Sequence, residues 1–449
     1  MTSPIYNQLK EKYEGKKVLV VGLGLLGGGL GVVQFFSQLG AYVIVSDKKS
    51  EGQLLPSIEK LKKFKNIDYH LGGHYKDDFN NADIIFKGPS VPWDLTEIIA
   101  AQKKGVPIEM ELSFVVKNFP GKVIGVTGTR GKSTTTYLIY HLLKKLKINV
   151  LLGGGLPNIS TINYLKIAEK SDWLVVELSS WSLSAFHKKK LSPKIAVFTS
   201  FYPDHLNYYK SLDEYFYDKA AIFLYQKKED YLIANKSLKD LVKRYPVSSQ
   251  INYCTKEDFP YHLKYLPGDH NLENASFALK VIEVLRLNRE KAVKIIRNFS
   301  GLPFRLQKIK EKNNVVFIND STSTTPIATI KAIDSFSRKK IVLLLGGNSK
   351  NLPYDELIKR LKEVEKIVLL EGSFTKEILP ILKEKYQEKL IGPFDNLKPA
   401  VEKAYQIGLG LKDAVVLFSP GATSFSMFNN EFDRGESFNK IVYNLQLLS

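Results

Sequence analysis

The chain has 449 residues, of which 44% are hydrophobic and 25% charged, and this composition is typical of a globular protein with two or three domains. No apolar run approaches the roughly 20 residues that span a bilayer, and the first residues lack the basic and apolar regions of a signal peptide. A single cysteine excludes an intramolecular disulfide framework and a zinc cluster built on thiolates. We therefore expect a cytoplasmic protein with no membrane association.

The formal net charge of +19 raises the question of an anionic partner. No arginine-rich tract or RNA-binding motif accompanies this charge, and many lysines lie in runs typical of solvated helix faces, as at residues 60–65. We therefore expect small anionic substrates and no nucleic acid. An ATPase that acts on nucleic acid is the alternative, and stimulation of ATP hydrolysis by DNA or RNA would indicate it.

The first predicted domain begins with a strand, 17–21, that leads into the G-x-G-x-x-G pattern of residues 22–27. A second predicted strand, 42–45, ends near Asp47. Dinucleotide folds bind a diphosphate at such a helix N-terminus and a ribose through such a carboxylate. The pattern alone would suggest an NAD-dependent oxidoreductase, and close helix–strand packing is the alternative. Further strand–helix units, with a strand at 82–86, predict a parallel α/β sheet.

A second glycine-rich segment follows the predicted buried strand Val123–Val126 and precedes an amphipathic helix, 137–146. A strand, a glycine loop, Lys-Ser and a helix form a polyphosphate site, because backbone N–H groups face the anion, the lysine reaches the terminal phosphates and the hydroxyl binds Mg²⁺. Val126 stands where the strict motif has its first glycine. We expect this segment to bind ATP through Gly128, Thr129, Arg130, Gly131, Lys132, Ser133 and Thr134.

Several polar residues follow predicted elements of the same region. Glu177 ends a buried strand, and a carboxylate there commonly serves Mg²⁺, although a helix cap is the alternative. His205 follows the strand 195–200. Asn271 and Asn274 lie on one face of a predicted helix, where two amides suit an adenine edge as well as they suit local hydrogen bonds.

These motifs resemble those of the Mur ligases, in the same order and spacing, over essentially the whole chain. The segments that carry the resemblance are Thr127–Ser133, Glu177–Ser180, Asp204–Leu206, Tyr215–Lys219 and Gly268–Asn271. The family consists of ATP-dependent, amide-forming enzymes of peptidoglycan synthesis. The resemblance implies an α/β protein with three domains, namely a Rossmann-like UDP-substrate domain at 1–120, a central P-loop ATP-binding domain at 121–302 and a Rossmann-like amino-acid domain at 303–449.

The resemblance also implies a set of catalytic and metal-binding residues. Ser133 or Thr134, together with Glu177, would hold one Mg²⁺. A second Mg²⁺ would lie between Glu177, His205 and Lys219, with Lys219 N6-carboxylated by CO₂. A carbamate converts an ammonium into an oxygen donor, which explains a lysine at a cation site. The implied catalytic residues are Lys132, Glu177, His205, Lys219 and Arg305.

In the last domain, residues 301–306 resemble the hinge of the family, with Arg305 near the γ-phosphate of ATP and Asp320 at its ribose. Strands at 315–320, 341–345, 366–370 and 414–418 predict a second doubly wound sheet. Pro326 is well placed in the first turn of a helix.

Within the family, the segments 343–350 and 419–425 are most similar to those of members that add D-glutamate to UDP-N-acetylmuramoyl-L-alanine through an acyl phosphate. The implied D-glutamate contacts are Thr324, Lys350, Ser424 and Phe432, where cationic and hydroxyl donors suit a dicarboxylate. The alternatives are that Lys350 is an ordinary lysine in a turn and that Ser424 caps a helix. The implied UDP-substrate contacts are Gly22, Leu23, Gly24, Asp47, Ser90, Asn158 and Ser179. We expect a monomer.

Three positions depart from the family pattern. Arg130 stands where many members have Asn, Thr322 stands where the motif has Lys, and Gly28-Gly29 differs from the commoner sequence. A missing cation at Thr322 leaves open a sister ligase that adds another amino acid. An enzyme similar to folylpolyglutamate synthase is a further alternative, but that branch lacks the G-x-G-x-x-G start.

Overall fold

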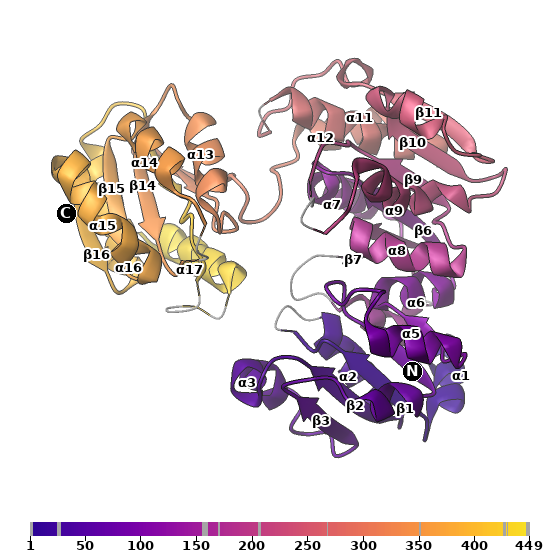
Figure 1. Ribbon diagram of the computed structural model, residues 1–449. Coiled ribbons are helices and arrows are strands. Elements are labelled where there is room, and N and C mark those ends of the chain that lie inside the picture. Colours follow the sequence, from indigo (N-terminus) through magenta and orange to yellow (C-terminus); the bar gives the residue numbers. More distant parts are fainter. Residues whose placement is uncertain are drawn as a thin grey trace. The chain divides into compact units, whose positions relative to one another are not determined.

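The computed structural model describes residues 3–24, 28–154, 160–168, 171–204, 208–266, 268–349, 352–424, 428 and 430–445. Three α/β sheets follow one another along the chain (Figure 1). The chain packs as two compact units, of which one contains Met1–Leu263 and Gly268–Arg297 and the other contains Lys264–Pro267 and Asn298–Ser449. None of the helices in the described ranges combines the length and apolar character that a membrane span requires.

The first sheet is wholly parallel and has the order β3-β2-β1-β4-β5. Its strands are β1 (Lys17–Val21), β2 (Tyr42–Asp47), β3 (Ile67–Leu71), β4 (Ile84–Lys87) and β5 (Ile108–Glu109). The connecting helices are α1 (Pro4–Tyr13), α2 (Gly28–Gln38), α3 (Glu51–Glu59), α4 (Lys76–Asn80), α5 (Thr96–Lys103) and α6 (Glu111–Asn118). The strand order reverses between β1 and β4, and such a switch point is where open α/β sheets bind ligands.

The second sheet is also parallel, in the order β11-β10-β9-β6-β8-β7. Its strands are β6 (Lys122–Thr127), β7 (Val150–Gly154), β8 (Trp173–Glu177), β9 (Ile195–Phe198), β10 (Tyr231–Asn235) and β11 (Gln250–Cys254). The helices are α7 (Lys132–Lys145), η1 (Thr161–Lys166), α8 (Ser180–Lys189), α9 (Leu212–Leu224), η3 (Lys236–Leu238), α10 (Lys239–Val242), η4 (Lys256–Asp258), α11 (Asp269–Val284) and α12 (Arg289–Arg297). Because β6 lies between β8 and β9, the loops after these three strands meet at one edge.

The first two sheets share one hydrophobic core. Phe36 on α2 and Phe114 on α6 belong to the same buried cluster as Ile162 and Leu165 on η1. The N-cap of α1 is tied to η1 as well, since the backbone N–H of Ser3 donates to the Lys166 carbonyl over 3.0 Å. The helices of the first sheet therefore bury their apolar faces against the second sheet's segment.

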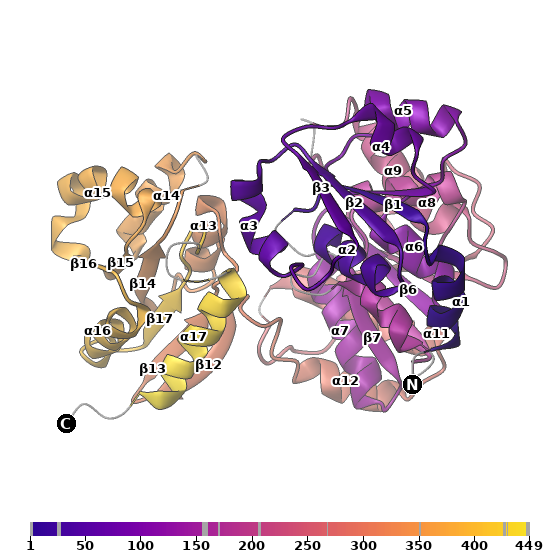
Figure 2. The same cartoon turned by 90° about the horizontal axis from the view of Figure 1, so that it is seen from below.

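The third sheet has the order β12-β13-β17-β14-β15-β16, and only β12 is antiparallel to its neighbour. Its strands are β12 (Gln307–Lys312), β13 (Val315–Asn319), β14 (Lys340–Gly346), β15 (Lys366–Leu370), β16 (Leu390–Phe394) and β17 (Ala414–Phe418). The helices are α13 (Pro326–Asp334), α14 (Asp355–Arg360), η5 (Leu361–Glu363), α15 (Ser373–Tyr386), η6 (Gln387–Lys389), α16 (Leu397–Leu409) and α17 (Glu431–Asn444). Figure 2 shows α17 running along β12 and β13. The sheet has a separate hydrophobic core on each face.

Candidate active site

The glycine loop of the second sheet lies between β6 and α7 and is held by the segment that follows β9. The backbone N–H of Thr129 donates to the Ser200 carbonyl over 2.8 Å, and that of Arg130 donates to Ser200 Oγ over 2.9 Å. Gly131 has a left-handed φ of 84°, and a Cβ there would lie 2.6 Å from Asn274 Oδ1. The loop thus leads directly into the N-terminus of a fourteen-residue helix, where the first backbone N–H groups have no partner within the helix itself.

Two lysine ammonium groups meet at one carbonyl oxygen of this loop. Lys132 Nζ and Lys219 Nζ each donate to the Gly128 carbonyl over 3.0 Å. Lys219 lies on α9 and is only 1% exposed. Burial, followed by repulsion from Lys132, lowers the pKa of the Lys219 ammonium to about 7, against the opposing attraction of Asp204 and Glu177. Lys219 is therefore a buried amine that loses its proton more readily than an exposed lysine does.

Glu177, at the end of β8, has a carboxylate oxygen that is buried and unpaired. Its Oε2 atom accepts no hydrogen bond within the described structure. A buried carboxylate oxygen without a donor is costly unless a cation binds it, so the donor set suits a divalent metal. No three carboxylate, histidine or cysteine side chains of the described ranges gather closely enough to hold a metal. The predicted ligand His205 lies outside those ranges.

The predicted adenine amides lie beside the glycine loop. Asn274 Nδ2 donates to Asn271 Oδ1 over 3.2 Å, and Asn274 Oδ1 accepts from Thr135 on α7 over 3.1 Å. Both amides are at least nine-tenths buried. The spacing of i and i+3 on α11 therefore brings them together as the sequence indicated.

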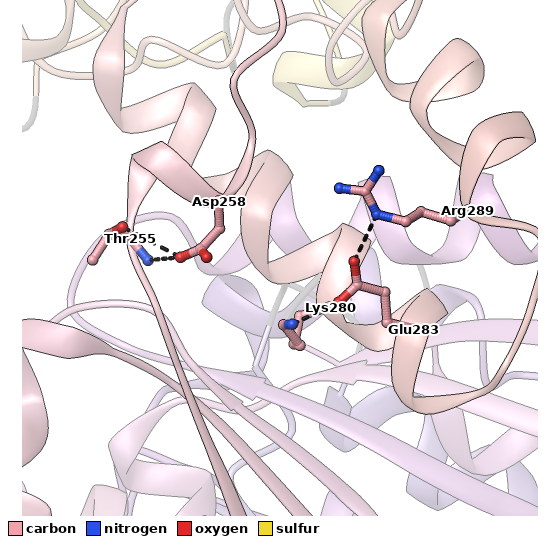
Figure 3. Close-up of polar contacts among 5 residues, drawn as sticks. All are labelled: Thr255, Asp258, Lys280, Glu283 and Arg289. Atoms are coloured by element: carbon pink, nitrogen blue, oxygen red, sulfur yellow. Dashed lines mark hydrogen bonds and ion pairs between the residues drawn. The ribbon is translucent and has the colours of Figure 1, made fainter.

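The far end of α11 is braced by the contacts drawn in Figure 3. Glu283 accepts from Lys280 on the same helix and, over 2.9 Å, from Arg289 at the start of α12. Asp258 accepts from the Thr255 backbone N–H over 2.7 Å and from its hydroxyl, which forms a cap on η4. Because η4 and α12 both pack against α11, these bonds fix the helix that carries the two amides.

In the first sheet, Asp47 closes the loop after β1. Its Oδ2 atom accepts from the backbone N–H of Leu23 over 2.9 Å, and its Oδ1 atom accepts from that of Lys49 over 2.9 Å. Gly22 and Gly24 take positive φ in this loop. The carboxylate thus shapes the glycine loop, and the residue that caps the N-terminus of α3 is Ser50. Helix α2 begins at Gly28, one residue after the G-x-G-x-x-G pattern.

The other predicted UDP-substrate residues lie on different elements. Ser90 is exposed in the loop after β4, which packs against the loop after β1 through Val91 and Gly22. Ser179 is the N-cap of α8, where its hydroxyl accepts from the Ser182 backbone N–H over 3.1 Å. Asn158 lies outside the described residues.

In the third sheet, Asp320 follows β13 and is almost fully buried. Its Oδ1 atom accepts from the Leu306 backbone N–H over 3.0 Å, and its Oδ2 atom accepts from the hydroxyls of Ser323 and Ser419. Burial raises the pKa of the Asp320 carboxyl to about 6, and these donors oppose the shift. In this arrangement both carboxylate oxygens accept hydrogen bonds from protein donors.

The predicted amino-acid contacts follow neighbouring strands of the same sheet. Thr324 lies in the loop after β13, and Ser424 lies in the loop after β17 with a buried hydroxyl that has no hydrogen-bond partner in the described structure. The ring of Phe432 packs edge-on against Phe304, with centroids 6.0 Å apart. Lys350 lies outside the described residues.

One residue that holds these loops was missed from the sequence. Arg434 on α17 is 1% exposed and donates to Ser321 Oγ, to the Ser321 carbonyl and to the Ala422 carbonyl over 2.7–3.1 Å. It joins the loop after β13 to the loop after β17. A lone arginine in a polar helix carries no pattern that distinguishes it from a solvated side chain.

Family profiles match three segments of the chain. The Mur ligase MurD-like N-terminal domain matches residues 16–109, the Mur ligase middle domain matches residues 126–258, and the Mur ligase glutamate ligase domain matches residues 304–421. A protein of Borreliella afzelii (strain PKo) named UDP-N-acetylmuramoylalanine--D-glutamate ligase is 33% identical over 94% of this chain and 97% of its own length. The chain belongs to the Mur ligase family.

Other relatives of this Mur ligase carry the same name. The protein of Roseiflexus sp. (strain RS-1) is 32% identical over 95% of this chain and 98% of its own length. Among solved structures, the UDP-N-acetylmuramate-alanine ligase MurC of Thermotoga maritima is 21% identical with a TM-score of 0.56, covering 95% of this chain and 99% of its own. The MurF ligase of Thermotoga maritima in complex with ADP is 19% identical with a TM-score of 0.53, covering 97% and 96%. These two structures share the fold of this Mur ligase.

Proposed function

We propose that this Mur ligase uses ATP to join D-glutamate to UDP-N-acetylmuramoyl-L-alanine. The names of the full-length relatives support this choice over a sister ligase or a folate-type ligase. The observation that supports the reaction type is the set of groups at the carboxyl ends of β6 and β8, beside α9. There a phosphate loop, the unpaired Glu177 oxygen and the buried Lys219 amine lie at one end of a parallel sheet.

Each part of ATP has a matching group in the chain. The backbone N–H groups at the start of α7 would bind the phosphates, and Lys132 would leave the Gly128 carbonyl to reach them. Asn271 and Asn274 would read adenine. Arg305 would reach the γ-phosphate and Asp320 the ribose. For Asp320 this role requires a rearrangement of its present donors.

Magnesium ions would bind at the same strand ends, beside the Glu177 carboxylate. Ser133 or Thr134 with Glu177 would hold one ion, and Glu177 with His205 and a carboxylated Lys219 would hold the other. The burial of Lys219 and the lowered pKa of its ammonium support the carbamate, because only a neutral amine attacks CO₂. When bound, the ions supply positive charge for the phosphoryl group.

The reaction proceeds in two steps. The carboxylate of UDP-N-acetylmuramoyl-L-alanine attacks the γ-phosphate of ATP and gives an acyl phosphate and ADP. The amine of D-glutamate then attacks the acyl carbon, and phosphate leaves. Lys132 and Arg305 neutralise charge on the transferring group, which is catalysis by positioning and electrostatics.

The substrates would bind at the carboxyl ends of strands in the first and third sheets. Gly22, Leu23, Gly24, Asp47 and Ser90 surround the switch point between β1 and β4 and suit a nucleotide diphosphate, with Asn158 and Ser179 on the neighbouring sheet. The unpaired Ser424 hydroxyl supports a carboxylate of D-glutamate beside Thr324, Lys350 and Phe432. The corresponding domains are 1–120, 121–302 and 303–449, in a cytoplasmic monomer.

Phosphate release from ATP and Mg²⁺ tests the proposal. With UDP-N-acetylmuramoyl-L-alanine present, we expect turnover with D-glutamate and none with L-glutamate or without an amino acid. Turnover with a different amino acid would reassign the third domain, and turnover stimulated by DNA or RNA alone would contradict the whole proposal.

A further inference from the structure

The residue before and the residue after Arg305 have left-handed backbone conformations. Phe304 has φ of 62° and Leu306 has φ of 44°, and neither is a glycine. L-residues pay a steric cost in this region, so such a turn persists only where its surroundings impose it. The structure of the turn therefore depends on bonds from outside it.

Three side chains supply those bonds. Thr322 donates twice to the Phe304 carbonyl, through its backbone N–H over 3.1 Å and through its hydroxyl over 2.8 Å. The Phe304 backbone N–H donates to Gln307 Oε1 over 2.9 Å. The Leu306 backbone N–H donates to Asp320 Oδ1 over 3.0 Å. Both flanks of Arg305 are thus bonded to the loop after β13 or to the start of β12.

The side chain of Phe304 is held by α17. It packs edge-on against Phe432 on α17. It also covers Gly435, where a Cβ would collide with the ring. The turn is therefore fixed to α17 as well as to the loop after β13.

We propose that Thr322 is a positioning residue, which holds the Phe304–Leu306 turn so that Arg305 is presented as a rigid part of the third sheet's unit. The proposal deepens the proposed function, because it rests on the role of Arg305 at the γ-phosphate. The Thr322 hydroxyl donates its proton to a backbone carbonyl and therefore does not donate to a carboxylate of the amino-acid substrate. Thr322 thus stabilises the 304–306 turn at a position where the family motif has a lysine.

Thr322→Val removes the hydroxyl bond and keeps the shape of the side chain. Loss of one such bond should lower kcat about five- to tenfold, with KM for UDP-N-acetylmuramoyl-L-alanine and for D-glutamate unchanged. Thr322→Ser should restore kcat. The matched control is Ser335→Ala, which removes an exposed hydroxyl that donates to the Lys331 carbonyl over 2.8 Å in the same unit, and it should leave kcat unchanged.

A double-mutant cycle with Arg305→Ala separates positioning from a general structural effect. If Thr322 acts through Arg305, Thr322→Val should cause no further loss in the Arg305→Ala background. Gly435→Ala, which displaces the Phe304 ring from the other side, should show the same dependence on Arg305. Multiplicative losses in the cycle, or a raised KM for D-glutamate in Thr322→Val, would overturn the proposal.

Hydrogen exchange gives a readout that does not depend on activity. In Thr322→Val, the amides of residues 304–306 should exchange faster, while those of β14 should not change. Unchanged exchange at 304–306 would overturn the clamp. If the wild-type protein released no phosphate with either substrate, the proposed function would fail, and hydrogen exchange would still decide whether Thr322 holds the turn.

Discussion

At the Gly128 carbonyl, one oxygen accepts hydrogen bonds from Lys132 and Lys219 together. The two cations repel each other, and this repulsion contributes to the lowered pKa of Lys219. An anion at the loop would relieve the repulsion by drawing Lys132 toward it. The shared carbonyl is consistent with the proposed roles of Lys132 at phosphate and of Lys219 as the amine that is carboxylated.

Lys132→Met tests this role. We expect kcat/KM for ATP to fall about 10²- to 10³-fold, because a positioned cation stabilises the transferring phosphoryl group. Lys144→Met, at the exposed far end of α7, is the control and should change kcat/KM less than twofold, which is roughly the scale of a surface substitution. Equal losses in both variants would contradict a specific role for Lys132.

Gly131→Ala tests the geometry of the loop. We expect a loss of about 1–3 kcal/mol in the free energy of unfolding, because alanine is strained at φ of 84° and its Cβ meets Asn274 Oδ1. The control is Gly52→Ala within α3, where the Cβ would meet no atom within 4 Å. Because alanine has the higher helix propensity, this variant should gain about 0.5–1 kcal/mol in the free energy of unfolding. Thermal unfolding of both variants measures the contrast.

Where a motif set the neighbours of a residue, the sequence predicted its position in the fold, and the roles of these residues stay predictions. The glycine loop, the Glu177 position and the amide pair of α11 lie where spacing placed them. The contacts of Arg434 could not be predicted, because its acceptors are distant in the sequence. Ala422 is 12 residues away and Ser321 is 113 residues away. The clamp by Thr322 could not be predicted either, because it depends on the backbone conformation of Phe304.

At the scale of elements, the parallel strands were predictable because they are continuous apolar runs buried on both faces. The ends of the strands were less predictable. The strand expected to run to Ser200 ends at Phe198, and the side chains of Thr199 and Ser200 donate to the Arg130 carbonyl of the glycine loop. The sharing of a core by the first two sheets also had no sequence signal, because apolar periodicity shows a buried face and not its partner.

Glu111 joins α6 to η1 across this shared core and gives a pH-dependent prediction. Its Oε1 atom accepts from the Ile162 backbone N–H over 3.1 Å, and burial raises the pKa of its carboxyl to about 7. The folded state therefore binds more protons than the unfolded state between pH 4.5 and 7, so the free energy of unfolding falls as pH rises through that interval.

Glu111→Gln removes this dependence. We expect the variant to be more stable than the wild type at pH 8 by on the order of 2 kcal/mol, and the difference to shrink toward pH 5. Denaturant unfolding at the two pH values measures it. Glu229→Gln, at an exposed turn, should alter stability at neither pH. A gain at pH 5 that equals the gain at pH 8 would contradict the ionisation argument.

For the whole molecule, the cores predict which fragments fold. Residues 298–449 contain both cores of the third sheet, so this fragment should unfold cooperatively when produced alone. Residues 1–120 lack the η1 side chains that complete their core and should not unfold cooperatively, whereas 1–297 should. Calorimetry of the three fragments tests this, and a cooperative transition in 1–120 would show that the shared core is dispensable.

The shared core also bears on synthesis at the ribosome. Phe36 on α2 and Phe114 on α6 emerge early, but η1, which packs against both helices, is added about fifty residues after Phe114, roughly three to ten seconds later at common elongation rates. During that interval the nascent chain exposes the apolar faces of α2 and α6 that η1 covers in the folded protein. The emerging chain is therefore a client for chaperones that bind apolar segments near the exit tunnel, and slow codons between 120 and 165 should increase its aggregation.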